Sequence, residues 1–237
     1  MNVQDASKKN SWQMFNRIAK TYDSVNRMLS FGLDVGWRKK VGLLLPQSPN
    51  LRLLDLATGT ADQVLLLCKE HPNQITNAVG MDLSEGMLSF GREKVKAQQL
   101  ESVISLQTGD AVNLPVEDTQ FDAITISFGI RNVPDVPKAL TEMVRVLKPS
   151  GKALILEFSM PKNPIVRFGH LFYLRFVLPF VGGLVSGDYE AYRYLNTSIE
   201  GFPYGESFAE LMRDAGFSTV RCHELSFGIA TIYEGVR

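Results

Sequence analysis

The chain contains little cysteine. Cys68 and Cys222 are the two cysteines in 237 residues, and they form no C-x-x-C pair. Disulfide-stabilised secreted domains and cysteine-rich zinc modules carry several cysteines at short spacings, so the sequence argues against both classes. The histidines, at positions 71, 170 and 223, are also scattered. The sequence therefore predicts a reduced protein with no metal site.

The chain also lacks an excess of charge of either sign, because 25 Lys and Arg residues balance 25 Asp and Glu residues. Nucleic-acid-binding proteins and polybasic membrane anchors usually carry more basic than acidic residues. The N-terminal stretch MNVQDASKKNSW has no apolar segment after its positive charges, which argues against a signal peptide. We therefore expect a cytoplasmic protein that binds no nucleic acid.

Long apolar runs are missing as well. A membrane-spanning helix needs roughly 20 consecutive apolar residues. The best candidate, LFYLRFVLPFVGGLV at 171–185, is shorter and is interrupted by Arg175 and Pro179. We expect this segment to touch a lipid surface or to line an apolar pocket, but not to cross a membrane.

What the sequence does contain, from residue 51 onward, is an alternation of short apolar runs and amphipathic stretches. This alternation is typical of βαβ units and a parallel sheet. Strands are predicted at 51–57, 75–82, 103–109, 121–128, 152–159, 220–226 and 228–237, and helices at 61–70, 85–99, 135–147 and 205–215. The last two strands are close enough to form a hairpin, which adds an antiparallel pair to the sheet. The helix over 135–147 should end at KPSG, where Gly151 supplies the permissive backbone dihedrals.

These elements form one domain with additions on both sides of its core. An apolar stripe at helical spacing in residues 12–29 favours core packing, and we expect residues 1–50 to form a helical cover over the open end of the sheet. The stripe consists of Trp12, Phe15, Ile18, Tyr22, Val25, Met28 and Leu29. The core is predicted over 51–159, an apolar insert over 160–204, and a helix with the hairpin over 205–237.

Ligands of open α/β sheets bind at the carboxyl ends of the strands. The segment DLATGTAD, which begins at Asp55, follows the first predicted strand. Gly59 permits a tight turn there, and the next helix directs its free N–H groups toward the crevice. Asp55 is either part of this site or an ordinary loop carboxylate. Ala57 and Thr58 stand where a G-x-G-x-x-G fingerprint would need glycine, which disfavours a nicotinamide-dependent oxidoreductase.

Polar residues also follow the next strands. Asp82 ends the second strand, about 20 residues after the turn, where a carboxylate accepts hydrogen bonds from both hydroxyls of a ribose. Ser84 is better explained as a helix cap. Asp110 suits an adenine amino group and the Ala111 N–H a ring nitrogen, although Gly-Asp is also ordinary turn chemistry. With Ser127 after the fourth strand, the set predicts a nucleoside lying across one edge of the sheet.

This joint pattern resembles the class I S-adenosylmethionine-dependent methyltransferases. Longer segments, above all YDSVNRMLSFG at 22–32 and SFGIRNV at 127–133, are similar to the ubiquinone/menaquinone biosynthesis C-methyltransferases, and the resemblance covers 12–237. It implies an α/β, Rossmann-like sheet of seven strands, mostly parallel with a reversed terminal strand and with helices on both faces. It also implies S-adenosylmethionine as cofactor. The family's cofactor-contact positions fall on Thr60, Asp82, Asp110, Ala111 and Ser127.

Two positions depart from the family pattern. Thr58 stands where the glycine-rich turn often carries another glycine, and Ser150 stands in a turn that reads KPGG in the family. The first departure bears on how closely the backbone approaches the cofactor. The second is remote from the predicted chemistry.

The resemblance also implies the reaction, which is methylation of a ring carbon of a polyprenylated quinol. Demethylmenaquinol is favoured, and 2-methoxy-6-polyprenyl-1,4-benzoquinol, a ubiquinone precursor, is the alternative. Carbon attacks only when a ring oxygen gives up its proton, so the site must stabilise a phenolate and hold ring and methyl about 3–3.5 Å apart.

Arg131 and Asn132 can supply a cation and an amide to that oxygen. Arginine, with a pKa above ~12, is a poor proton acceptor, so a water, the quinol itself, Tyr22 or Asp23 must take the proton. The structural alternative is that Arg131 only pairs with Asp135 or caps a helix. A catalytically silent cofactor-binding subunit is disfavoured because the chain retains Arg131 and Asn132.

The insert then has a role to fill. Burial of each CH₂ of a polyprenyl tail gives about 0.8 kcal/mol. The apolar residues expected either to line the tail's channel or to press against a bilayer are Phe168, Leu171, Phe172, Phe176, Val177, Phe180 and Leu184. Contact with a bilayer would make the protein peripheral to the inner face of the membrane. Ordinary packing of two extra helices is equally open, and Tyr192 and Tyr194 are candidates to face the ring. The sequence indicates no oligomeric state.

Overall fold

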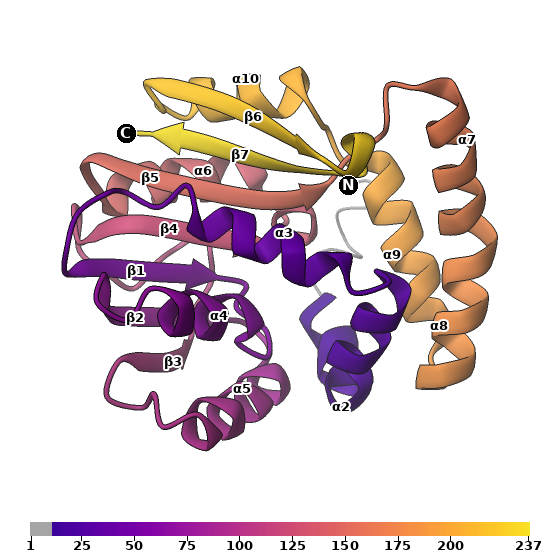
Figure 1. Ribbon diagram of the computed structural model, residues 1–237, viewed down its shortest axis with the longest axis horizontal. Coiled ribbons are helices and arrows are strands. Elements are labelled where there is room, and N and C mark those ends of the chain that lie inside the picture. Colours follow the sequence, from indigo (N-terminus) through magenta and orange to yellow (C-terminus); the bar gives the residue numbers. More distant parts are fainter. Residues whose placement is uncertain (1–10) are drawn as a thin grey trace.

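One sheet organises the molecule, and the computed structural model describes it within residues 11–237 (Figure 1). Its seven strands run in the order β3-β2-β1-β4-β5-β7-β6. Their bounds are Leu51–Leu56 (β1), Ile75–Asp82 (β2), Ile104–Thr108 (β3), Phe121–Ser127 (β4), Leu147–Phe158 (β5), Thr219–Leu225 (β6) and Ala230–Val236 (β7). Strands β1 to β5 pair in parallel, whereas β7 is antiparallel to both β5 and β6. The predicted fold class, with its reversed terminal strand, is confirmed.

The strand order places a crevice at the centre of the sheet. The chain begins at β1, moves outward through β2 to β3, and then returns to β4 on the other side of β1. Connections therefore leave β1 and β4 in opposite directions, and the space outside their carboxyl ends is the usual ligand site of such sheets.

Helices cover both faces of the sheet, as predicted. The described helices are α2 (Ser11–Leu29), α3 (Leu33–Gly42), α4 (Asp62–Glu70), α5 (Glu85–Ala97), α6 (Val136–Val146), α7 (Pro164–Phe172), α8 (Leu178–Ser186), α9 (Tyr189–Gly201) and α10 (Glu206–Asp214). Of these, α3, α4 and α5 pack on one face of the sheet and α6 and α10 on the other. Successive strand residues point to opposite faces, so Leu54 packs in the core with α6 and α10, while Leu53 packs in the core with α3 and α4.

The N-terminal helix α2 packs against the insert rather than on the sheet. Ile18, Val25 and Leu29 of α2 join Leu174 and Tyr192 of the insert in a third apolar cluster. Figure 1 shows this helical group standing beside the carboxyl ends of the strands. Residues 1–10, the first part of the predicted 1–50 cover, lie outside the described residues. They include most of the N-terminal stretch that was predicted not to be a signal peptide.

The turn between α6 and β5 differs from the prediction. Strand β5 begins at Leu147, not at residue 152, so KPSG lies within the strand. The left-handed backbone conformation belongs to Ser150, with φ 64°, and not to Gly151. Glycine is needed at 151 for space, because an added Cβ would lie 2.8 Å from the carbonyl oxygen of Lys148.

The insert contains a longer helix than expected. Helix α7, the π-helical turn η2 (Tyr173–Val177) and α8 run without a break over Pro164–Ser186. Within the described part of the chain this is the one helix long and apolar enough to cross a membrane. The prediction that the apolar segment is too short to span a membrane is therefore wrong as far as its length is concerned. Helices that pack inside a fold pass the same test, and Leu174 and Leu178 pack in the third cluster.

Candidate active site

A buried carboxylate supports the turn after β1 from behind. Asp55 is buried, and its two oxygens accept hydrogen bonds from the hydroxyls of Thr58 (2.6 Å) and Thr125 (2.5 Å). Burial raises the pKa of Asp55 to about 6, against the lowering effect of the two hydroxyls. Asp55 therefore shapes the turn. It does not line the cavity of about 100 Å³ at the strand ends, but it lines a smaller one of about 30 Å³ that the turn also borders, so its predicted contact with the cofactor stays a prediction.

The turn itself has unusual backbone geometry. Ala57, Gly59 and Ala61 have φ values of 46°, 56° and 68°, which cost about 1 kcal/mol or more in a residue with a Cβ. Thr58 has no such conformation; its N–H donates to the Met81 carbonyl (3.0 Å). The departure from the family pattern at Thr58 is thus accommodated, because that position does not require glycine.

Asp82 connects this turn to the end of β2. One oxygen accepts the N–H of Gly59 (2.8 Å) and the other accepts the N–H of Ser84 (2.8 Å). Burial raises the pKa of Asp82, while these N–H donors lower it. The hydroxyl of Ser84 accepts the N–H of Met87 (3.2 Å), which confirms its predicted role as a helix cap.

A cavity of about 100 Å³ lies at these strand ends, and we call it the strand-end cavity. The predicted cofactor residues Gly59, Asp82, Asp110, Ala111 and Ser127 line it. Gly59 faces open space, since an added Cβ would meet no atom within 4 Å. A carboxylate, a free approach to the backbone and the Gly-Asp-Ala turn are what a nucleoside with a charged tail requires, so these residues fit S-adenosylmethionine. Side chains of α2 close over the cavity.

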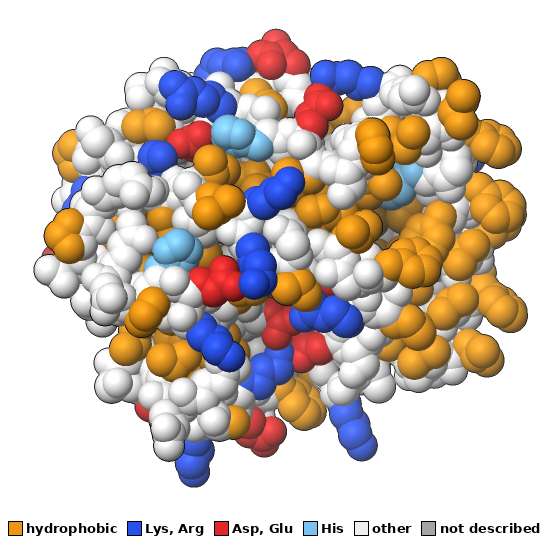
Figure 2. All heavy atoms as spheres, in the orientation of Figure 1, with side chains coloured by type: hydrophobic (Ala, Val, Ile, Leu, Met, Phe, Trp, Pro, Cys, Tyr) orange, Lys and Arg blue, Asp and Glu red, His pale blue; other side chains and the backbone are white. Residues whose placement is uncertain are grey.

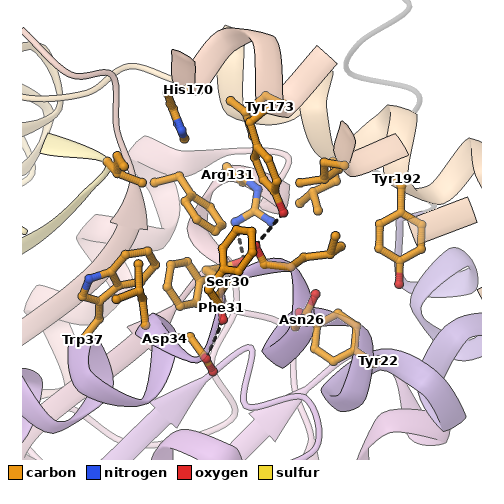
Figure 3. Close-up of a pocket in the computed structure, with 18 of the residues that line it drawn as sticks. Tyr22, Asn26, Ser30, Phe31, Asp34, Trp37, Arg131, His170, Tyr173 and Tyr192 are labelled. Carbon is orange, nitrogen blue, oxygen red and sulfur yellow. Dashed lines mark hydrogen bonds between the residues drawn. The ribbon is translucent and has the colours of Figure 1, made fainter. Parts of the chain in front are cut away.

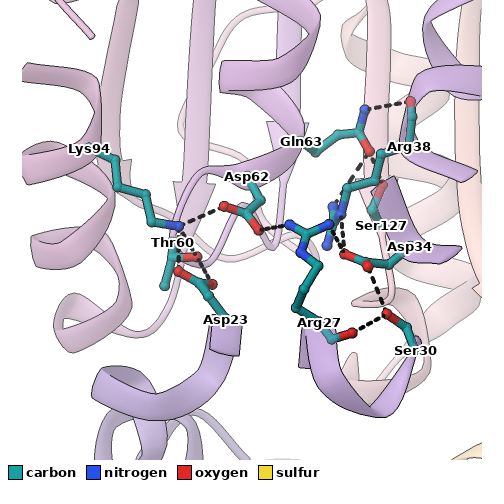
Figure 4. A network of polar contacts seen from close by, with 10 residues as sticks. All are labelled: Asp23, Arg27, Ser30, Asp34, Arg38, Thr60, Asp62, Gln63, Lys94 and Ser127. Carbon is teal, nitrogen blue, oxygen red and sulfur yellow. Dashed lines mark hydrogen bonds and ion pairs between the residues drawn. The ribbon is translucent and has the colours of Figure 1, made fainter. Parts of the chain in front are cut away.

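Two other predicted residues lie outside the strand-end cavity. The hydroxyl of Thr60 donates to Asp23 (2.6 Å) and accepts from Lys94 Nζ (3.0 Å). Asp23 is also 2.5 Å from Lys94, which in turn pairs with Asp62 (2.6 Å). Figure 4 shows this network joining α2 to the turn after β1. Thr60 and Asp23 therefore attach the cover to the core in the structure, and contact of either with a ligand stays a prediction.

A larger cavity of about 370 Å³ adjoins the first, and we call it the acceptor cavity (Figure 3). Its walls come from α2, α3, α7 and α9 and from the ends of β4 and β5. Most of the lining is apolar. The residues that line both cavities are Phe15, Tyr22, Phe128 and Asn132. The structure therefore joins the strand-end cavity to an apolar cavity through a short shared wall.

Arg131 lines the acceptor cavity, but its charge is already compensated. Its Nη1 lies 2.7 Å from Glu157 Oε1 and 2.6 Å from the Phe128 carbonyl oxygen, and its Nε donates to Ser198 (3.3 Å). The pairing with Asp135 considered from the sequence is wrong, because Asp135 caps α6 through the N–H of Lys138. Glu157 was missed, although a lone carboxylate inside the apolar strand KALILEFS signals a buried partner.

The polar groups at the shared wall are those of Tyr22 and Asn132, with Tyr194 next to them. The Tyr194 hydroxyl donates to Asn132 Oδ1 (3.2 Å), which leaves the Asn132 amino group free to donate. Burial raises the pKa of Tyr22, and the nearby Arg131 and Arg38 lower it. Tyr22 is therefore a hydroxyl donor at neutral pH and not a proton acceptor.

His170 was not predicted as a site residue. It lines the acceptor cavity, and its Nε2 is buried without a hydrogen-bond partner among the residues described. Burial lowers its pKa, so the ring is neutral at pH 7. A single histidine in an apolar helix has no pattern that separates such a position from ordinary packing.

Comparison with known proteins agrees with this geometry. A family model described as the ubiE/COQ5 methyltransferase family matches residues 3–237. The chain belongs to this family. It is 46% identical to the demethylmenaquinone methyltransferase of Thermus thermophilus, over 94% of this chain and 100% of that one. It is 44% identical to the ubiquinone/menaquinone biosynthesis C-methyltransferase UbiE of Geobacter sulfurreducens, over 94% of this chain and 86% of the relative.

Solved structures show the same fold at low identity. The [4+2]-cyclase SpnF has a TM-score of 0.70 and 16% identity, over 95% of this chain and 94% of that one. An S-adenosylmethionine-dependent methyltransferase from Thermotoga maritima, described as a possible histamine N-methyltransferase, has a TM-score of 0.64 and 21% identity, over 95% and 99%. One fold thus serves different reactions. Membership of the ubiE/COQ5 family makes this protein an S-adenosylmethionine-dependent methyltransferase, as predicted.

Proposed function

We propose that this member of the ubiE/COQ5 family methylates a ring carbon of a polyprenylated quinol, and that the quinol is demethylmenaquinol. The observation that carries the proposal is the apolar acceptor cavity of about 370 Å³ beside the strand-end cavity. A cavity of about 150 Å³ holds benzene, so this one has room for a fused two-ring head and the start of a tail. The name of the Thermus thermophilus relative supports demethylmenaquinol.

The chemistry divides between the cofactor and the cavity wall. S-adenosylmethionine supplies an electrophilic methyl group. Tyr22 and the Asn132 amino group, both on the shared wall, are positioned to donate hydrogen bonds to an oxygen of the acceptor ring. Preorganised donors of this kind stabilise a developing oxyanion because they need no reorganisation during the reaction. His170 is neutral, and its Nε2 has no hydrogen-bond partner among the described residues, so it can bind the second ring oxygen.

Arg131 is expected to stabilise the phenolate less strongly than the sequence predicted. Because Glu157 neutralises it, Arg131 contributes less to an oxyanion than a free guanidinium would. Its contacts with the Phe128 carbonyl and Ser198 fix the shared wall to α9. Asp23, engaged with Lys94 outside the acceptor cavity, is poorly placed to take the proton, and so we assign that step to water.

We further propose that the outer face of the insert docks on the inner face of a membrane. Large apolar side chains on α7, η2 and α8 are exposed, namely Ile165, Phe168, Phe172, Phe176, Phe180 and Leu184. Figure 2 shows hydrophobic side chains gathered on the side of the molecule where α7 and α8 lie in Figure 1. Contiguous apolar patches of this kind mark protein or membrane contacts. A bilayer is the occupant that we favour, because the proposed acceptor carries a polyprenyl tail that dissolves there.

The position of the cavity supports this arrangement. None of the insert residues predicted to line a tail channel lines the acceptor cavity. Val166 and Gly169 of α7 and Tyr173 of η2 line it instead. Phe31 lines the cavity and is 79% exposed, and its ring lies 6.0 Å from that of Tyr173. The edge between these two rings is where a tail would leave the cavity for the bilayer.

The test is conversion of defined acceptors. Purified protein is given S-adenosylmethionine with a labelled methyl group and, in vesicles, either demethylmenaquinol or 2-methoxy-6-polyprenyl-1,4-benzoquinol. Mass spectrometry should find one added methyl on the first, with the higher kcat/KM. A preference for the benzoquinol would overturn the proposed substrate, and no methylation of either would overturn the quinol reaction.

A further inference from the structure

The guanidinium of Arg38, on α3, lacks a full set of partners. Its Nε is buried without a hydrogen bond to any described residue and lies 3.9 Å from Asp34 Oδ2. Its Nη1 reaches Gln63 Oε1 only at 3.5 Å. Asp34 is meanwhile engaged by Arg27 (2.9 Å) and by the hydroxyl of Ser30 (2.7 Å). Arg38 is therefore a mostly buried cation, with 13% of its side chain exposed, whose nearest carboxylate is shared with another arginine.

This cation faces the reaction site. Arg38 lines the acceptor cavity, and its Cζ lies 5.4 Å from the ring centroid of Phe128, a residue of the shared wall. Arg131 lies in the same way over Phe158, at 5.5 Å, and the two phenyl rings are 4.6 Å apart. Two guanidiniums thus rest on adjacent aromatic rings at one end of the acceptor cavity.

The two cations differ in how far their charge is compensated. Arg131 has a buried carboxylate, Glu157, at 2.7 Å, whereas the ion pair that Arg38 makes among the described residues is with Asp34, at 3.9 Å. Coulomb energy falls with distance, and it counts most where water is excluded. Arg38 therefore offers the larger unbalanced positive charge to an anion in the cavity. Tyr22, the phenol already at this wall, is within reach of both charges, as their common lowering effect on its pKa shows.

We propose that Arg38 binds the reacting hydroxyl oxygen of the quinol and holds it as an anion, which makes Arg38 a further catalytic residue. This inference depends on the proposed quinol reaction. Arginine itself takes no proton, because its pKa exceeds ~12. The hydroxyl proton passes to water, and the electron pair left on the oxygen forms the carbonyl as the ring carbon bonds to the methyl group. The C–S pair stays on sulfur. The ring proton then leaves to water, and the aromatic ring returns.

A binding titration without turnover tests the charge directly. The probe is 1-naphthol, whose anion absorbs at longer wavelength than the neutral form, bound with S-adenosylhomocysteine present. We expect the wild-type protein to lower the pKa of bound naphthol. In Arg38→Gln the pKa should rise again, so that the acid dissociation constant of bound naphthol is at least tenfold smaller than in the wild-type protein. Arg38→Lys should restore part of the shift. Lys39→Gln, which removes an exposed neighbouring cation paired with Glu70, should change nothing.

Turnover provides the second measurement. Arg38→Gln should reduce kcat by on the order of 100-fold, as loss of an oxyanion donor does, with a small change in KM. Arg38 does not line the strand-end cavity, but it borders a smaller cavity of about 30 Å³ together with the predicted cofactor residues Gly59 and Thr60. S-adenosylmethionine binding is therefore measured alongside, and its persistence in Arg38→Gln reports on folding. A wild-type naphthol pKa that is unshifted, or equal in Arg38→Gln, would overturn the role of Arg38. Failure of the quinol reaction appears separately, as absence of methyl transfer by the wild-type protein.

Discussion

Arg131 and Glu157 form a buried ion pair, with 2.7 Å between Nη1 and Oε1, across the ends of two adjacent strands. Residues 127 and 156 are register partners in β4 and β5, and the 3₁₀ turn η1 (Ile130–Asn132) brings Arg131 back over the end of β5. Breaking one side of such a pair leaves an uncompensated charge in a dry environment. The arginine of the family motif is thus a structural element as well as a group in the acceptor site.

Replacement of Arg131 alone is therefore expected to destabilise the protein. Arg131→Ala should lower the free energy of unfolding by about 3–5 kcal/mol, because it leaves the buried Glu157 carboxylate with backbone N–H donors but without a cation. Arg131→Met with Glu157→Gln should recover most of that loss, because no buried charge remains. Urea denaturation of Arg131→Met, of Glu157→Gln and of the double variant measures the coupling between the two side chains. Equal stability of Arg131→Met and the double variant would contradict the account.

The double variant also separates stability from chemistry. If the Arg131 charge serves turnover, the stable Arg131→Met, Glu157→Gln protein should lose activity while it still binds S-adenosylmethionine, since Arg131 does not line the strand-end cavity. Full activity in the double variant would leave Arg131 only its structural role.

The sequence predicted the sheet and the strand-end residues because both follow from local patterns. Apolar alternation fixes the strands, and a parallel sheet brings their carboxyl ends together, so Asp82 and Asp110 converge without knowledge of the packing. Glu157 could not be assigned to Arg131 in this way. Their contact depends on strand register and on a turn, and 26 residues separate them.

The insert shows a second limit of the sequence pattern. Apolar residues occur on more than one side of the helix over Pro164–Ser186, so periodicity cannot say which side packs and which faces outward. Packing of Leu174 and Leu178 against the cover decides this, and it turns Phe168 and Phe176 away from the cavity. Arg38 was not singled out for a similar reason: its missing partners are visible only when Asp34 is seen bound to Arg27.

Asp82 should control cofactor affinity. Asp82→Ala removes the acceptor for the N–H groups of Gly59 and Ser84 as well as the predicted ribose contact, so calorimetry should find S-adenosylmethionine binding at least 100-fold weaker. Asp82→Asn keeps the size of the side chain and one acceptor oxygen, so its S-adenosylmethionine affinity should lie between those of the wild-type protein and Asp82→Ala. Asp118→Ala, at an exposed carboxylate, is the matched control. Unchanged affinity in Asp82→Ala would show that the strand-end cavity is assigned to the wrong ligand.

Asp55 should impose a pH dependence on stability. Burial raises its pKa from 3.8 to about 6, so between these values the folded state binds a proton that the unfolded state has lost. Stability from this group is therefore complete below about pH 4 and is lost as pH rises to about 6. A shift of about two units corresponds to about 3 kcal/mol.

Asp55→Asn removes that titration. Denaturant unfolding at pH 4, 5, 6 and 7 should show the variant gaining stability relative to wild type as pH rises, with the difference constant above about pH 6. Glu117→Gln, which removes a carboxylate elsewhere, gives the background. A wild-type minus Asp55→Asn difference that is flat with pH would contradict the raised pKa.

The outer face of the insert should bind lipid. Phe168, Phe176 and Phe180 are 75%, 63% and 66% exposed and line neither cavity, so their combined replacement by Ser should leave the fold intact. Flotation with phospholipid vesicles should show at least tenfold weaker binding, since apolar area drives insertion. Methylation of vesicle-borne demethylmenaquinol should fall in parallel, whereas a tail-less quinol in water should react as with wild type. Leu43→Ser is the control, because Leu43 is 73% exposed and lies directly after α3. Equal vesicle binding by the triple variant and the control would contradict the proposed membrane contact of the insert.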